Sequence, residues 1–241
     1  MRKWKIWVPD ESMLYSMPGP QDIAEYYSPP RVLDHAKQMG LQGCLSLDIL
    51  TGWDFRKQDR RLLSIALLAA WQVFMLILFP PCTACSQLQR MWNFKKMSAQ
   101  RVEALWSSGM CFLEHSMLAA QEQVARSCFF AFEHPAGATS WSQDCVDSVR
   151  KLPGVFTVVF DQCMLGLVSK VNRIPMRKRT RIMTNSYMLA SHLKGRLCDK
   201  SHEHQQIQGT EGGMKRSVWA QLYPPGLVHC LVQGTQQQLR V

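Results

Sequence analysis

Residues 73–82 read Val-Phe-Met-Leu-Ile-Leu-Phe-Pro-Pro-Cys, and this stretch decides the fold class. Seven consecutive apolar residues that end at two prolines are typical of a strand buried on both faces of a parallel sheet. A second run of this kind, residues 128–132, ends in Glu133-His134-Pro135. Helical patterns separate such runs along the chain. The sequence therefore predicts an α/β fold, Rossmann-like, with a mostly parallel sheet and helices on both faces.

The uncharged stretch at residues 62–79 is long enough to suggest a membrane span. Five charged residues at 56–61 precede it, however, and helix-forming Leu, Ile and Ala follow them. We therefore predict a helix over 56–70 and a buried strand over 73–79, with no membrane partner. The further strands are predicted at 23–27, 43–49, 128–132, 155–160 and 180–184, and the further helices at 28–39, 98–127, 142–152, 186–193 and 224–238.

The length of 241 residues predicts one domain with at most a small appendage. We expect an irregular tail at residues 1–20 and an α/β core at 21–165. Residues 166–241 are expected to form a basic, zinc-stabilised part that completes the domain.

Composition excludes several classes of protein. A hydrophobic content of 46% is too high for intrinsic disorder. Nine cysteines, an odd number, argue against a secreted disulfide framework and for a reducing intracellular location. A formal net charge of +10 favours a polyanionic partner such as nucleic acid. Composition leaves the oligomeric state open.

Reactive side chains follow several of the predicted strands, where ligands bind in open α/β sheets. Cys82 is expected to precede a helix, whose amide groups would stabilise a thiolate. Cys82 as a small buried hydrophobe is the alternative. Glu133 ends an apolar strand and must either pair within the protein or serve a ligand. The polar residues that follow the two earlier strands are Glu25, Ser28, Asp48 and Asp54.

Pro81-Cys82 and Glu133-His134-Pro135 together resemble two motifs of the DNA cytosine-5 methyltransferases, Pro-Cys and Glu-Asn-Val, over about residues 22–165. The resemblance implies a class I S-adenosylmethionine-dependent methyltransferase fold. It also implies that Cys82 adds to C6 of a flipped-out cytosine in DNA and that Glu133 holds the N3/N4 edge. By the same resemblance, the cofactor S-adenosyl-L-methionine contacts Glu25, Ser28, Asp48 and Asp54.

The sequence departs from that family at two places, so an inactive relative of the family is an open alternative. Ser28-Pro29-Pro30 stands where the family has a glycine-rich turn, and Glu133 is followed by His-Pro. Proline removes amide groups and adds bulk near the expected cofactor. The chain is also similar to degenerate methyltransferase-like modules carried in mobile-element polyproteins.

A cluster of Cys and His residues predicts a zinc site. Cys198, His202 and His204 lie within seven residues, and zinc commonly takes four such ligands. Cys163, just past a predicted strand, is the best fourth ligand, with Cys230 or His229 behind it. A solvated polar loop is the alternative.

Five positive charges fall within nine residues after the core. The alternation over 180–184 predicts a strand with a basic outer edge, which would contact nucleic-acid phosphates. A charged edge strand that prevents aggregation is the alternative, and nuclear targeting is a further possibility. The residues of this basic run are Arg173, Arg177, Lys178, Arg179 and Arg181.

Three functions remain open from the sequence. The first is a methyltransferase-like protein that acts on cytosine in DNA. The second is a thiol oxidoreductase, because Cys82 and Cys85 form a C-x-x-C pair. The third is a non-catalytic nucleic-acid-binding module of a mobile-element polyprotein.

Overall fold

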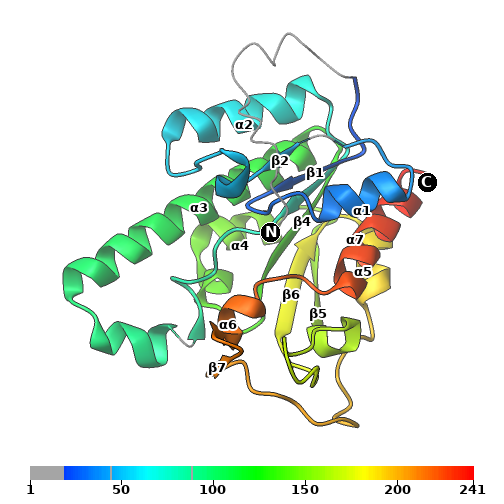
Figure 1. Cartoon of the computed structure of the whole chain (residues 1–241). Coiled ribbons are helices and arrows are strands. Elements are labelled where there is room, and N and C mark those ends of the chain that lie inside the picture. The colour runs from blue at the N-terminus through cyan, green and yellow to red at the C-terminus, as the bar shows by residue number, and fades with distance from the viewer. Residues whose placement is uncertain (1–18, 44, 88) are drawn as a thin grey trace.

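A six-stranded mixed sheet forms the centre of the computed structural model, which describes residues 19–43, 45–87 and 89–241 (Figure 1). The strand order is β2-β1-β3-β4-β6-β5, and only β6 runs against the other five. The α/β class and the mostly parallel sheet are thereby confirmed. Of the predicted tail, residues 1–18 lie outside the described part. The strands are β1 (Ile23–Tyr26), β2 (Ser46–Leu47), β3 (Met75–Leu78), β4 (Phe129–Pro135), β5 (Phe156–Asp161) and β6 (Arg179–Thr184).

Helices cover both faces of the sheet, each over its own apolar cluster. One cluster packs α2 (Gln58–Ala70), α3 (Ala99–Ala125) and α4 (Asp144–Arg150) against the sheet. The other packs α1 (Val32–Gln38), α5 (Tyr187–Leu193) and α7 (Pro225–Gln238) against the opposite face. Shorter elements are η2 (Ile49–Thr51), η3 (Gln89–Asn93), η4 (Phe94–Lys96), η5 (Thr139–Ser142), η6 (Gln162–Leu165), β7 (Thr210–Glu211), β8 (Met214–Lys215) and α6 (Arg216–Trp219).

The uncharged stretch at 62–79 divides as predicted into the end of α2 and the whole of β3. Each residue of β3 is buried, because β1 and β4 flank it and helices cover both of its faces. Among the described residues, none of the helices combines the length and the apolar character that crossing a membrane requires.

Three local predictions are wrong. The first helix starts at Val32 rather than after Ser28, which does not cap it. β4 continues through Glu133 to Pro135, because β6 pairs with that end of the strand. β6 itself is an interior strand between β4 and β5 rather than a basic outer edge. Both faces of β6 are covered, as the consecutive residues Ile182 and Met183 are fully buried in the two opposite apolar clusters.

Gly234 permits close packing of α7 on α5. A Cβ atom at this position would collide with the Leu189 backbone. We expect Gly234→Ala to lower the free energy of unfolding by about 1–3 kcal/mol, because backbone cannot move aside as a flexible side chain can. Urea unfolding measures the change, with Ser191→Ala on the exposed side of α5 as the control. Equal midpoints for the two variants would contradict the prediction.

Candidate functional site

The carboxylate of Glu25 forms hydrogen bonds within the protein. It lies at the end of β1 with no exposed surface. Its two oxygens accept hydrogen bonds from the backbone N–H groups of Val32 (3.3 Å) and Leu33 (3.0 Å). Glu25 thus caps α1 in place of Ser28. Burial raises the pKa of Glu25 to about 8, although the two amide hydrogen bonds oppose this shift.

The other predicted cofactor residues are also engaged by the chain. The Ser28 hydroxyl donates to the Pro29 carbonyl at 3.0 Å. The Asp48 carboxylate accepts from the Leu50 N–H at 2.8 Å and caps η2. Burial raises the pKa of Asp48. Asp54 binds the Arg56 guanidinium through both oxygens, at 2.8 and 2.7 Å.

Aromatic side chains pack just beyond β1. Tyr27 has a φ of 63°, a left-handed conformation, directly before Ser28-Pro29-Pro30. Its ring centroid lies 4.2 Å from that of Phe55, and its hydroxyl lies 2.6 Å from Nδ1 of His115. Glu25, Ser28, Asp48 and Asp54 each have partners in the chain, and Pro29 and Pro30 offer no amides. The residues present therefore do not fit an S-adenosylmethionine site.

Cys82 and Glu133 form a second cluster, at the ends of the adjacent parallel strands β3 and β4. The Tyr223 hydroxyl donates to Oε2 of Glu133 at 2.6 Å, and the Lys178 ammonium lies 3.7 Å from Oε1. Oε1 is buried and has no hydrogen-bond partner among the described residues. Lys178 also lies over the Tyr223 ring, 5.3 Å from its centroid. We call these four residues the strand-end cluster.

His134 fixes the loop that carries Cys82. Its Nδ1 lies 2.7 Å from the Ser140 hydroxyl and its Nε2 lies 3.2 Å from the Pro80 carbonyl. Burial lowers the pKa of His134 to about 3, so the ring is neutral at pH 7. A neutral ring can donate from Nε2 to the carbonyl and accept at Nδ1 from the hydroxyl. His134 therefore ties Pro80 to β4.

The expected helix directly after Cys82 is absent from the described residues, where a turn follows instead. Burial raises the pKa of the half-buried Cys82 thiol, and Glu133 adds to this shift while Lys178 opposes it. Burial also raises the pKa of Cys85. Both side chains are thus mostly thiols at neutral pH, which disfavours the thiolate chemistry expected of a C-x-x-C pair.

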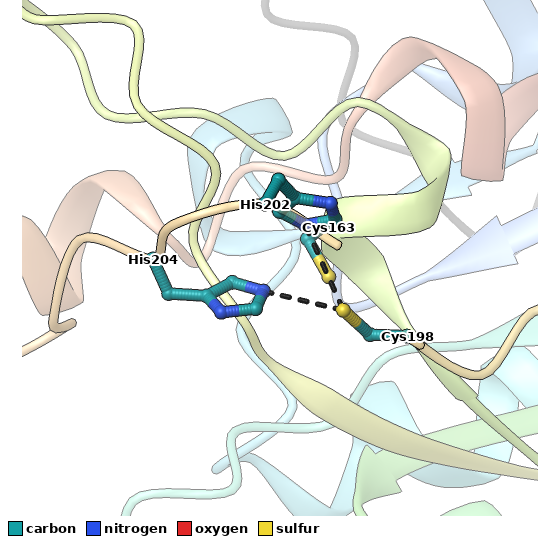
Figure 2. Close-up of side chains that lie close together, drawn as sticks. All are labelled: Cys163, Cys198, His202 and His204. Carbon is teal, nitrogen blue, oxygen red and sulfur yellow. Dashed lines mark hydrogen bonds between the residues drawn. The ribbon is translucent and has the colours of Figure 1, made fainter. Parts of the chain in front are cut away.

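Cys163, Cys198, His202 and His204 come together as predicted, in a group that could hold a metal ion (Figure 2). Their ligand atoms all lie within 4.8 Å of one another. The Cys198 sulfur is 3.7 Å from Nε2 of His202 and 3.4 Å from Nε2 of His204. Ligands about 2.0–2.3 Å from a tetrahedral ion lie roughly 3.3–3.8 Å apart. The group therefore needs only a small contraction around an ion.

Asp161 joins this group of candidate metal ligands to the basic run. Its fully buried carboxylate accepts the Cys198 N–H at 3.0 Å. Arg179 donates to both of its oxygens, at 3.0 and 2.8 Å, and Arg177 lies 3.4 Å away. Burial opposes these contacts, but together they lower the pKa of Asp161. Asp161 therefore fixes the backbone at Cys198 through its N–H group, and so helps to position one of the four candidate ligands.

Three of the five cations in the basic run have a carboxylate partner within the protein. Arg177 and Arg179 share Asp161, and Lys178 faces Glu133. The Arg181 guanidinium lies over the Trp141 ring, 5.0 Å from its centroid. Arg173 lies in the preceding loop with a φ of 59°. The expected outer strand is wrong, because β6 is interior, whereas contact of these residues with nucleic-acid phosphates stays a prediction.

Sequence reasoning missed Tyr223, His134 and the role of Lys178. Of these three, only His134 could have been noticed from the sequence, because it directly follows Glu133. The fold and these contacts define an α/β protein with a Cys/His group able to hold a metal ion. No protein-family model matches the chain, and no curated protein matches it either.

Proposed function

We propose that the ion bound by Cys163, Cys198, His202 and His204 is Zn²⁺ and that its role is structural. Two thiolates and two imidazoles are a common tetrahedral set for zinc, and four protein ligands leave no open position for a substrate. Cys163 comes from η6, directly after β5, whereas the other three ligands come from the segment after α5. The ion would therefore join two parts of the chain about 35 residues apart.

We further propose that the protein is methyltransferase-like and binds cytosine in DNA, as a relative that does not use S-adenosylmethionine. One observation carries this proposal. Cys82, which follows β3, interacts electrostatically with Glu133 near the end of β4, and a buried oxygen of Glu133 has no hydrogen-bond partner among the described residues. The mixed sheet is compatible with a class I methyltransferase fold. Glu25, Ser28 and Asp48 form hydrogen bonds within the chain, which supports the loss of cofactor binding.

The strand-end cluster suits an unstacked cytosine. Oε1 of Glu133 can accept a hydrogen bond from the exocyclic N4 amino group, a pairing that carboxylates make with cytosine. Tyr223 holds the other oxygen and so orients the carboxylate. The Lys178 ammonium stands beside it as a donor for O2 of the base. Cys82, largely a thiol at neutral pH, contacts the base without adding to it.

Two measurements test this proposal. Calorimetry with S-adenosylmethionine is expected to give no binding heat. Anisotropy with labelled single strands is expected to show tighter binding to oligodeoxycytidylate than to oligothymidylate, by roughly tenfold. Glu133→Gln should remove most of this preference, because an amide offers a weaker acceptor than a carboxylate.

Glu122→Gln, on α3, is the matched control and should keep the preference. Equal affinity of the wild type for the two strands would overturn base recognition. Tight cofactor binding would instead favour an active methyltransferase. A non-catalytic module of a mobile-element polyprotein agrees with the expected results, whereas the oxidoreductase alternative has no matching observation.

A further inference from the structure

The segment between the Cys82 loop and the body of α3 stands away from the sheet. It comprises η3, η4 and the first residues of α3, and we call residues 89–101 the basic arm. In Figure 1 the basic arm lies at the amino-terminal end of α3, on the side of the molecule opposite α1 and α5. Because the basic arm stands away from the sheet, many of its side chains are exposed.

The exposed side chains of the basic arm are of two kinds. Met91 and Trp92 are large hydrophobic residues with 59% and 58% of their surface exposed. The exposed cations around them are Arg90, Lys95, Lys96 and Arg101.

No acidic residue occurs in the sequence between Asp59 and Glu103. Within the described part of the chain, none of the four cations forms an ion pair. The basic arm therefore carries positive charge that no ion pair among the described residues compensates, in contrast to Arg177, Lys178 and Arg179, which pair with Asp161 or Glu133.

We propose that the basic arm binds single-stranded DNA, with a base stacked on Trp92 and phosphates bound by the four cations. Aromatic platforms flanked by cations are the usual means of binding unpaired strands without sequence preference. An anionic membrane is a poorer match, because interfacial binding uses a long amphipathic helix with a continuous apolar face. Here η3 and η4 are short, and the large exposed hydrophobic residues Met91 and Trp92 are neighbours within η3.

The root of the basic arm is anchored beside the strand-end cluster. Ala84 and Cys85, which directly follow the Cys82 turn, are buried in the core. Gly109 of α3 packs closely on Ala84, and a Cβ atom there would meet the Ala84 side chain at 2.5 Å. A strand held on the arm would therefore run toward the carboxyl ends of β3 and β4. This inference deepens the proposed function, and the arm's own affinity is testable without it.

The test uses a labelled oligothymidylate of about 20 nucleotides, followed by anisotropy over a salt series. Trp92→Ala is expected to weaken binding by about tenfold, the usual loss of one stacked base. The double variant Lys95→Gln/Lys96→Gln should flatten the slope of log affinity against log salt by about 1.4, for two lost phosphate contacts. Tyr187→Ala and Lys37→Gln, on α5 and α1, are the matched controls and should behave as wild type.

Two outcomes would overturn the inference. One is an arm variant that binds the oligonucleotide as tightly as its control. The other is a wild-type protein that ignores the oligonucleotide but binds phosphatidylserine vesicles through Trp92. Because oligothymidylate contains no cytosine, failure of base recognition at Glu133 leaves this result unchanged. The two proposals can therefore fail separately.

Discussion

Cys198→Ser is expected to lower the free energy of unfolding by about 5 kcal/mol or more, the largest effect predicted for any single substitution here. Zinc binding to a four-ligand site contributes directly to folding, because the unfolded chain has no preformed site. Cys198 is central to this site, since its sulfur faces both histidines and its N–H binds Asp161. Loss of the ion should release the segment that follows α5.

Metal analysis and unfolding together check this expectation. Purified protein should contain about one zinc per chain, and a chelator should lower the urea midpoint of the wild type toward that of Cys198→Ser. Cys111→Ser is the matched control, since Cys111 is a half-buried free cysteine outside the metal centre. A zinc content near zero, or equal midpoints for the two serine variants, would remove the proposal.

Glu25→Gln is expected to stabilise the protein above pH 8 and to have little effect below about pH 4.5. Burial raises the pKa of Glu25 from 4.5 to about 8 in the folded state. Between these values the unfolded carboxyl is ionised while the folded one holds its proton. Stability that is present at low pH is therefore lost as pH rises, by about 1.4 kcal/mol per unit. The loss amounts to on the order of 5 kcal/mol once pH exceeds 8.

Urea unfolding at several pH values measures this effect. The wild type should become less stable from about pH 4.5 to pH 8, whereas Glu25→Gln should lack that component because glutamine stays neutral. Glu103→Gln, at an exposed position on α3, is the matched control. Parallel pH profiles for Glu25→Gln and wild type would show that the buried carboxyl does not titrate in this range.

Apolar runs and local spacing predicted much of the framework. Residues 73–79 and 128–132 are apolar over most of their length because both faces of each strand are covered, so β3 and β4 could be located from composition alone. Cys198, His202 and His204 lie within one short segment, so their meeting needs little help from the rest of the fold. Ser98 and Ser186 cap α3 and α5 through local hydrogen bonds.

Long-range contacts account for what the sequence did not reveal. The basic residues of 177–181 suggested an outer strand, yet the partners of a strand are distant in sequence and place β6 inside the sheet. Tyr223 meets Glu133 across 90 residues. Glu25 meets the amides of α1 only because the turn at Pro29 and Pro30 brings the helix back over the end of β1.

Periodicity and burial act on neighbouring residues, and so the chain alone indicates where the six strands of the main sheet and most helices lie, and it sets the spacing of three candidate metal ligands. Charged and hydrogen-bonding groups, in contrast, interact with the residues that lie close in space, which can be distant in the sequence. The segments that the fold brings close to a carboxylate therefore decide its role. Glu25 caps a helix, whereas Glu133 keeps one oxygen without a hydrogen-bond partner among the described residues. The run that opens at Val73 predicted where the strand would lie. Contacts from β4, β6 and the segment before α7 determine what surrounds Cys82 at its end.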